Sequence, residues 1–187
     1  MSPRHVSLLA LALGIGCTTD GGAGLDATPR DVFPAGPYGQ AEGEVLENLS
    51  FTSAEGAPFA LQGLRADEDA RLLLVVTAAG WCTACIEEQP SLQRLVDERG
   101  PDGLRVLVAV FEDSEFAPAG PADAADWQAE HALSFPVVAD PEFVLRDYYD
   151  SSLTPMNMLV RLGPMTIARV TTGWDPVLVE SLVEALL

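Results

Sequence analysis

The 187-residue sequence contains no lysine, so its ten basic residues are all arginine. Against 28 acidic residues they leave a formal net charge of −18 at pH 7. A field of that sign repels nucleic acid and anionic lipid, so the sequence predicts neither as a partner. An acidic excess is typical of a well-solvated surface, and a cationic partner is the alternative explanation.

No apolar run is long enough to span a bilayer, for which a helix needs about 20 residues. The apolar run nearest the N-terminus is "VSLLALALGIG" at residues 6–16, which follows Arg4 and His5 and ends at Cys17. A short basic segment before a short apolar run is typical of an export signal. The sequence therefore predicts a signal peptide rather than an anchor helix.

The text "GIGC" at the end of this run resembles the bacterial lipoprotein class, although Gly14 stands where that class usually has leucine. The resemblance implies that residues 1–16 form a signal peptide and that Cys17 is lipidated and becomes the mature N-terminus. Residues 17–43, rich in Gly, Pro, Ala and Asp without apolar periodicity, are then a flexible linker. We expect an extracytoplasmic, periplasmic protein that is lipid-anchored to a membrane.

Cysteine and histidine are scarce, with three and two copies. An odd cysteine count in an exported protein leaves one thiol to explain, and lipidation of Cys17 leaves the pair Cys82 and Cys85. A two-residue loop between cysteines constrains the unfolded chain little, so this pair indicates chemistry rather than a disulfide framework. Structural zinc needs four N or S ligands, but the mature chain offers this pair and His131, so we expect no metal and no cofactor.

Residues 44–187 are long enough for one domain with a core. The apolar run 71–78 predicts a strand buried on both faces, the helical spacing of apolar residues predicts a helix over 83–99, and 104–111 predicts a second buried strand. This order is a βαβ unit with parallel strands. The remaining predicted elements are short strands at 44–51 and 57–64, a helix near 122–131, a strand at 135–140, a short helix at 141–149, a strand hairpin at 156–161 and 166–172, and a helix over 175–187.

Cys82 and Cys85 stand at the start of the predicted helix, directly after a buried strand. A helix N-terminus offers unpaired N–H groups and a partial positive charge, which favour a thiolate over a thiol. Cys82 can then act as a nucleophile, and Cys85 is close enough to displace it from a mixed disulfide.

Three stretches resemble the TlpA/ResA group of exported, membrane-tethered thiol–disulfide oxidoreductases of the thioredoxin-like fold. They are "WCTAC", its continuation "CIEEQP", and "LTPMNMLV", where the group has a cis-proline before a strand. The resemblance covers residues 44–187 and implies an α/β fold. We expect a three-layer sandwich with a central mixed sheet flanked by helices, an N-terminal hairpin and a central insertion.

The resemblance also implies roles for single residues. Cys82 and Cys85 match the redox pair, and Glu88 matches a glutamate that exchanges a proton with the resolving thiol. The alternative for Glu88 is an exposed helix residue like Glu87.

Trp81, Thr154 and Pro155 match residues that bind the protein substrate. Thr154 precedes the proline, and its backbone pairs with a bound partner. The implied partners are dithiols and disulfides of exported proteins, and a membrane thiol reductase is a possible electron source. The implied direction is reduction, as in cytochrome c maturation.

The segment before the motif departs from the group, which usually has text such as "FWASWC". Thr77, Ala78 and Gly80 are smaller, which predicts a more open surface beside the cysteines. The alternative functions are a thioredoxin-like binding module and a copper-handling protein, each with a cysteine pair that does not cycle. Peroxidase chemistry on this fold usually needs a threonine three residues before the reactive cysteine, where this chain has Ala79.

Overall fold

The structure is a computed structural model that describes residues 29–187. The predicted signal peptide, Cys17 and the first part of the predicted linker lie outside the described residues. Within the described part, no helix combines the length and the apolar character needed to cross a membrane.

Strand β3 (Leu72–Ala79) is the centre of the molecule, and all eight of its residues are buried. It pairs in parallel with β4 (Leu104–Glu112) and antiparallel with β6 (Met156–Arg161). Both of its edges and both of its faces are covered, which is why its sequence is continuously apolar instead of alternating. The predicted strands at 71–78 and 104–111, and their parallel pairing, are confirmed.

The sheet has seven strands in the order β2-β1-β5-β4-β3-β6-β7. The pairs β3–β4 and β4–β5 are parallel and the others antiparallel, so the predicted mixed sheet is confirmed. The remaining strands are β1 (Ser50–Ser53), β2 (Pro58–Ala60), β5 (Val137–Ala139) and β7 (Thr166–Thr172).

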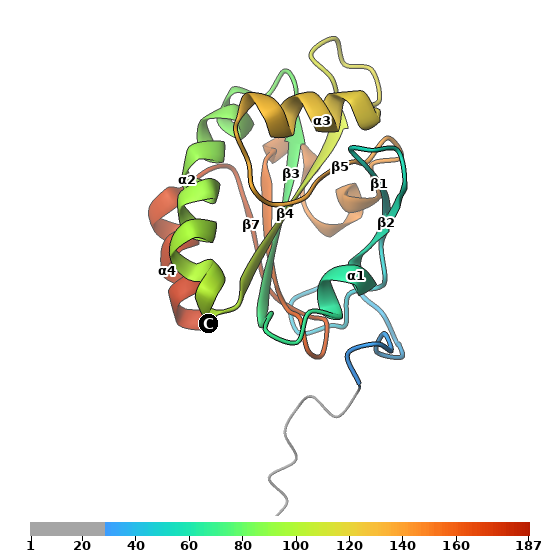
Figure 1. The fold of residues 1–187 in the computed structure, drawn as a ribbon, viewed down its shortest axis with the longest axis vertical. Helices are drawn as coiled ribbons and strands as arrows, with labels where there is room; N and C mark the ends of the chain where they lie inside the picture. Colours follow the sequence, from blue (N-terminus) through green and yellow to red (C-terminus); the bar gives the residue numbers. More distant parts are fainter. Residues whose placement is uncertain (1–28) are drawn as a thin grey trace, which may run out of the picture.

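Two cores cover the two faces of the sheet, which makes the predicted three-layer sandwich (Figure 1). Leu72, Leu74 and Val76 of β3 point into one core, while Leu73 and Val75 point into the other, as the two-residue period of a strand requires. The first core is closed by α2 (Thr83–Arg99), α3 (Pro121–Glu130) and α4 (Pro176–Leu186). The second is closed by α1 (Leu61–Arg65), the 3-10 helix η2 (Val144–Tyr148) and the N-terminal segment. Two further 3-10 helices are η1 (Gly100–Asp102) and η3 (Ser151–Leu153).

The predicted strands at 44–51 and 57–64 are only partly right. The hairpin exists as β1 and β2, but Leu61–Arg65 is the helix α1. Leu61 and Arg65 are four residues apart, so a helix places both on one face, and both are buried. The helix begins where the Gln62 N–H donates to the Asn48 Oδ1 (2.9 Å).

The predicted helix at 141–149 is shorter, since only η2 is helical. Asp140 sets its beginning, because its carboxylate accepts hydrogen bonds from the N–H groups of Val144 (2.9 Å) and Leu145 (3.3 Å). The last helix begins as predicted, with Asp175 as its N-cap and Pro176 as its first residue.

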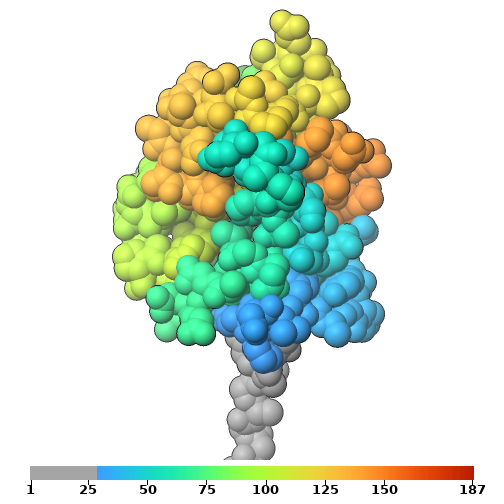
Figure 2. All heavy atoms as spheres, turned by 45° about the vertical axis from the view of Figure 1, so that its right-hand side comes forward, coloured from blue at the N-terminus to red at the C-terminus, as the bar shows by residue number. Residues whose placement is uncertain are grey.

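Residues 29–43, which the sequence assigns to the linker, contact the domain. The Gly43 N–H donates to the Ile167 carbonyl (2.8 Å), and the buried Arg65 donates to the Pro29 carbonyl (2.7 Å). The domain boundary at residue 44 stays a prediction. In Figure 2 this N-terminal segment, in blue, lies at the opposite end of the molecule from the yellow loop that follows β4.

Candidate functional site

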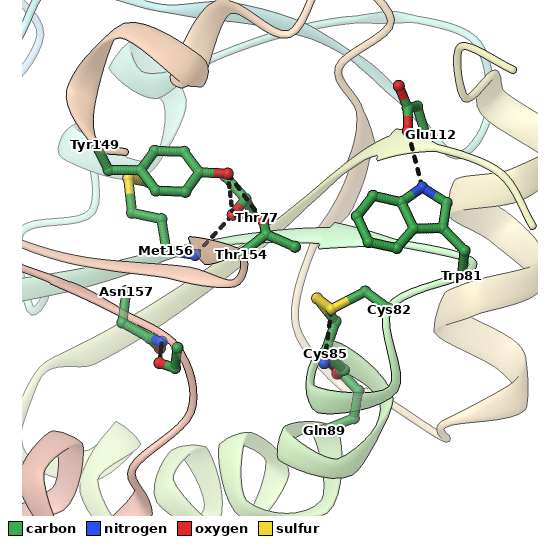
Figure 3. Close-up of a disulfide and its surroundings, with 11 residues drawn as sticks. Thr77, Trp81, Cys82, Cys85, Gln89, Glu112, Tyr149, Thr154, Met156 and Asn157 are labelled. Carbon is green, nitrogen blue, oxygen red and sulfur yellow. Dashed lines mark hydrogen bonds between the residues drawn. A yellow bond between two sulfur atoms is a disulfide. The ribbon is translucent and has the colours of Figure 1, made fainter. Parts of the chain in front are cut away.

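The described residues contain one disulfide, between Cys82 and Cys85, whose Cα atoms are 5.2 Å apart (Figure 3). It lies where the chain leaves β3 and enters α2. Cys82 is the N-cap of α2, and its Sγ accepts a hydrogen bond from the Cys85 N–H (3.1 Å). The positive end of a 17-residue helix therefore points at the sulfur of Cys82.

The two sulfurs differ in access. Cys82 keeps 5% of its surface exposed, whereas Cys85 is fully buried. A partner can therefore reach only Cys82 until the disulfide opens. The geometry distinguishes an outer cysteine from an inner one, in the order predicted for attacking and resolving thiols.

Trp81 precedes the disulfide and is 38% exposed. Its Nε1–H donates to the Glu112 Oε2 at the end of β4 (2.8 Å). Its ring stacks on Phe116 of the following loop, with centroids 5.3 Å apart and planes 18° apart. Two exposed rings thus form a fixed apolar surface beside Cys82.

Gly80 does not open the surface as its small size predicts. The backbone of the loop after β4 fills the space, since a Cβ at Gly80 would lie 2.5 Å from the Ser114 N and 2.7 Å from the Asp113 carbonyl carbon. The Gly80 N–H also donates to the Glu112 carbonyl (2.9 Å). Glycine is needed here because two backbones approach closely, and this approach brings Phe116 over Trp81.

The loop of Thr154 and Pro155 has the expected cis peptide bond. Hydrogen bonds on two sides hold this loop in place. The Gly173 N–H, at the end of β7, donates to the carbonyls of Leu153 (3.0 Å) and Pro155 (2.8 Å). On the other side the Met156 N–H donates to the Thr77 Oγ1 (2.8 Å). Thr154 and Met156 are among the residues around the disulfide in Figure 3.

Glu88 is fully buried, in contrast to the exposed Glu87. It lies three residues after Cys85 and therefore on the same face of α2. Burial raises the pKa of Glu88 well above its ordinary value, and the facing side chain of Asn157 opposes this rise only in part. Among the described residues neither carboxylate oxygen of Glu88 has a hydrogen-bond partner of ordinary geometry. Burial therefore favours the protonated, neutral form of Glu88.

Sequence reasoning missed several polar residues around the disulfide. Gln89 is buried, and its Nε2 donates to the Cys85 carbonyl (2.6 Å). Asn157 is buried on β6, where a polar residue inside the apolar text "MNMLV" was a visible signal. Thr77 and Tyr149 share hydrogen bonds with Thr154, and no pattern in the sequence connects them.

A groove of about 330 Å³ lies between the start of α2, the loop after β4 and α3. His131 is one of the residues that line it, and the centre of its ring is 4.8 Å from that of the buried Trp127. Six carboxylates make the groove strongly negative: Glu112, Asp113, Glu115, Asp123, Asp126 and Glu130.

In residues 29–187 no three His, Cys, Asp or Glu side chains are grouped to hold a metal ion.

The fold, with a cysteine pair at the start of the helix after its central strand, defines a thiol–disulfide oxidoreductase-like architecture of the thioredoxin-like class. The chain belongs to the AhpC/TSA family, which it matches over residues 43–169. No curated protein sequence matches it.

The chain is similar to many solved structures, among them the following three. A thiol:disulfide interchange protein of the thioredoxin family from Chlorobium tepidum has a TM-score of 0.59 and 17% identity, with 79% of this chain and 99% of that chain covered. A secreted disulfide oxidoreductase from Mycobacterium tuberculosis, homologous to E. coli DsbE, has a TM-score of 0.54 and 18% identity, with 74% and 96% covered. The exposed lipoprotein thioredoxin of Streptococcus pneumoniae has a TM-score of 0.57 and 20% identity, with 75% and 100% covered. At these identities the likeness shows the fold.

Replacement of Gly80 by alanine tests the close approach of the loop. We expect Gly80→Ala to lower the free energy of unfolding by roughly 1–3 kcal/mol, because backbone atoms must move to admit the Cβ. Urea unfolding measures the change. Gly63→Ala is the control, since a Cβ there meets no atom within 4 Å and alanine favours the helix by up to about 1 kcal/mol. Equal effects at the two positions would contradict the proposed packing.

Replacement of Glu88 by glutamine tests its buried protonation. The pKa of Glu88 is higher in the folded protein than its ordinary 4.5, so above that pH the folded state holds a proton that the unfolded state has lost. The stability of the wild type then falls as pH rises from 4.5 toward the folded pKa. Glutamine does not ionise, so we expect the stability of Glu88→Gln relative to the oxidised wild type to rise over this range.

Urea unfolding of the oxidised proteins at a series of pH values measures this difference. Asp140, whose pKa burial raises to about 6, titrates in both proteins and cancels. Glu87→Gln, on the exposed face of the same turn, is the control and should show no such trend. A difference that stays constant with pH for Glu88→Gln would show that the carboxyl is not held protonated.

Proposed function

We propose that the protein is an extracytoplasmic thiol–disulfide oxidoreductase that exchanges disulfides with exported proteins through Cys82 and Cys85. The observation that carries the proposal is the asymmetry of the pair. Cys82 caps the helix and is partly accessible, while Cys85 is closed behind it. A structural disulfide would need neither the helix end nor the difference in access.

The reduced pair would act in two steps. The Cys82 thiolate attacks one sulfur of a substrate disulfide, which forms a mixed disulfide and releases the other substrate sulfur as a thiolate. The Cys85 thiol then loses its proton and attacks Cys82, which releases the second substrate thiolate and closes the Cys82–Cys85 disulfide. Two electrons pass from the pair to the substrate, and an external dithiol must restore the pair.

The helix supports the first step. A helix N-terminus stabilises a nearby anion by about 0.3–1 kcal/mol, and by up to about 2 kcal/mol in partly buried sites. This enlarges the reactive fraction of a thiol whose ordinary pKa is about 8.5. The hydrogen bond from the Cys85 N–H to the Cys82 Sγ is the local form of this stabilisation.

Glu88 would serve the second step. Because Cys85 is fully buried, water cannot easily take its proton. Glu88 is on the same face of α2, and burial moves its pKa toward the range in which a carboxylate can accept a proton from a thiol. The neutral acid would return that proton when the pair is reduced again.

Trp81, Thr154 and Pro155 would bind the substrate around Cys82. The Trp81 ring supplies an exposed apolar contact, and Thr154 begins the loop that Gly173 and Thr77 hold in place. An extended substrate segment would pair with the backbone of Thr154.

We propose reduction as the physiological direction, with apocytochrome c or another exported protein as substrate and a membrane thiol reductase as electron donor. The names of the similar structures, a thiol:disulfide interchange protein and a secreted disulfide oxidoreductase, support this class of activity. The exposed lipoprotein among them supports anchoring through Cys17.

Substitution of each cysteine tests the proposed reaction. We expect Cys82→Ser to abolish the reduction of insulin, because the accessible sulfur of the Cys82–Cys85 pair is lost. Cys85→Ser should keep the first attack and accumulate a mixed disulfide, which mass spectrometry under non-reducing conditions detects. Cys17→Ser, the control, should reduce insulin at the wild-type rate. Unchanged activity in Cys82→Ser would exclude the proposal.

Equilibration of the Cys82–Cys85 pair with defined thiol–disulfide buffers, followed by alkylation and mass spectrometry, gives its reduction potential and hence the direction. A low potential agrees with a reductant, and a high one would contradict that part of the proposal. A pair that never equilibrates would point instead to a binding module with a permanent disulfide.

Anchoring through Cys17 is tested by metabolic labelling with a radioactive fatty acid. The wild type should carry the label and sediment with membranes, because a diacylated terminus binds a bilayer stably. Cys17→Ser should do neither. Equal labelling of the two proteins would refute lipidation at this residue.

A further inference from the structure

Three hydroxyl groups, one from β3 and two from the segment before β6, meet beside the loop of Thr154 and Pro155. Thr77 is near the end of β3, Tyr149 follows η2, and Thr154 begins the loop. The Thr77 Oγ1 lies 3.2 Å from the Tyr149 hydroxyl and 3.4 Å from the Thr154 Oγ1, and the Tyr149 hydroxyl lies 2.9 Å from the Thr154 Oγ1. Figure 3 shows the cluster with its hydrogen bonds.

The hydroxyls form one connected chain of hydrogen bonds. The Met156 N–H donates to the Thr77 Oγ1 (2.8 Å), and the Thr77 hydroxyl donates to the Tyr149 oxygen. The contact between Tyr149 and Thr154, in which either hydroxyl can be the donor, is the shortest of the three. Hydrogen bonds in such a chain polarise and strengthen one another.

The surroundings of Thr77 and Tyr149 hold these two side chains in place. Thr77 is fully buried, and the ring of Tyr149 makes an edge contact with Phe143, with centroids 6.3 Å apart. Phe143 stacks on Phe111 (3.9 Å), which in turn contacts Trp81 edge-on (6.2 Å). A row of rings therefore links the tryptophan on one side of the disulfide to the tyrosine that holds the loop on the other side.

We propose that the hydroxyls of Thr77 and Tyr149 are positioning groups for substrate binding, which orient Thr154 and its loop toward an extended polypeptide disulfide. The inference rests on the proposed thiol–disulfide exchange and adds residues that the family resemblance does not assign. When the two sequences are aligned at the WC dipeptide, Thr77 stands where the group's usual sequence "FWASWC" has phenylalanine. This protein therefore has a hydroxyl beside the loop at a position where an aromatic ring is usual. Neither hydroxyl contacts the sulfurs, so their loss acts on substrate affinity rather than on the chemistry.

Tyr149→Phe and Thr77→Val test the proposal, because each removes a hydroxyl and keeps the shape of the side chain. Loss of one such hydrogen bond corresponds to a factor of about 3–10 in binding. We expect kcat/KM for insulin reduction to fall by about that factor in each variant, mainly through a higher KM. Reduction of the small disulfide dithiobisnitrobenzoate, which cannot pair with the loop, should change less than twofold. Thr77→Ser should retain the wild-type KM for insulin.

Tyr148→Phe is the matched control, since it removes the hydroxyl of the neighbouring tyrosine, which faces Glu47 (3.5 Å) and not the loop. It should leave both rates unchanged, and the reduction potential should be the same in all variants. Equal losses for insulin and the small disulfide, or no loss for insulin, would overturn the positioning role. A wild type that reduces neither substrate would instead refute the proposed function, on which this inference rests.

Discussion

The complete burial of β3 fixes the place of every residue in the site. Its eight residues have hydrogen-bonded neighbours on both edges and a hydrophobic core on each face. A shift of one residue in register would move Leu72 and Leu74 to the opposite core and bring Leu73 in their place. Because the two cores are closely packed around side chains of particular shapes, such an exchange would disrupt both of them, and the pairing with β4 and β6 holds the observed register. Cys82 lies three residues beyond the end of β3, so the strand also fixes the position of Cys82.

The two neighbours of β3 each bring one half of the proposed substrate site. β4 runs parallel, so its end lies beside the end of β3 and delivers Glu112 and the loop with Phe116 to Trp81. β6 runs antiparallel, so its beginning lies at the same end of the sheet. Because β6 starts at Met156, directly after Pro155, the cis-proline loop must lie beside the cysteine pair. The arrangement therefore requires the mixed sheet. In a wholly parallel sheet with the same order of elements, the beginning of β6 and its cis-proline loop would lie at the opposite end from the cysteine pair.

The parts of this arrangement that could be predicted are those encoded in contiguous sequence. The strand at 71–78, the helix after it and the cysteines at their junction follow from one continuous stretch. Glu88 was distinguished from Glu87 by the resemblance alone, because the apolar pattern of the predicted helix includes Ile86, which is exposed in the structure. Contacts that depend on register could not be predicted. Thr77 meets Tyr149 across 72 residues, and Gly80 meets Ser114 only because the pairing of β3 with β4 shifts at its last residue.

The site also contains destabilising features, whose cost in free energy the rest of the fold must offset. Phe116 and Phe143 have positive φ angles of 65° and 48°, a left-handed conformation that costs about 1–3 kcal/mol for a residue other than glycine. Glu88 is buried, and the facing Asn157 offsets the cost of its burial only in part. Each feature places a group near the cysteine pair: Phe116 on Trp81, Phe143 between Phe111 and Tyr149, and a buried carboxyl on the face of α2 that carries Cys85. A carboxylate in water has a pKa of about 4, which is too low for it to accept the proton of a thiol readily. The burial that destabilises the ionised form of Glu88 is thus the property that suits it to the proposed proton exchange, and the closely packed β3 core supplies the stability that allows this burial.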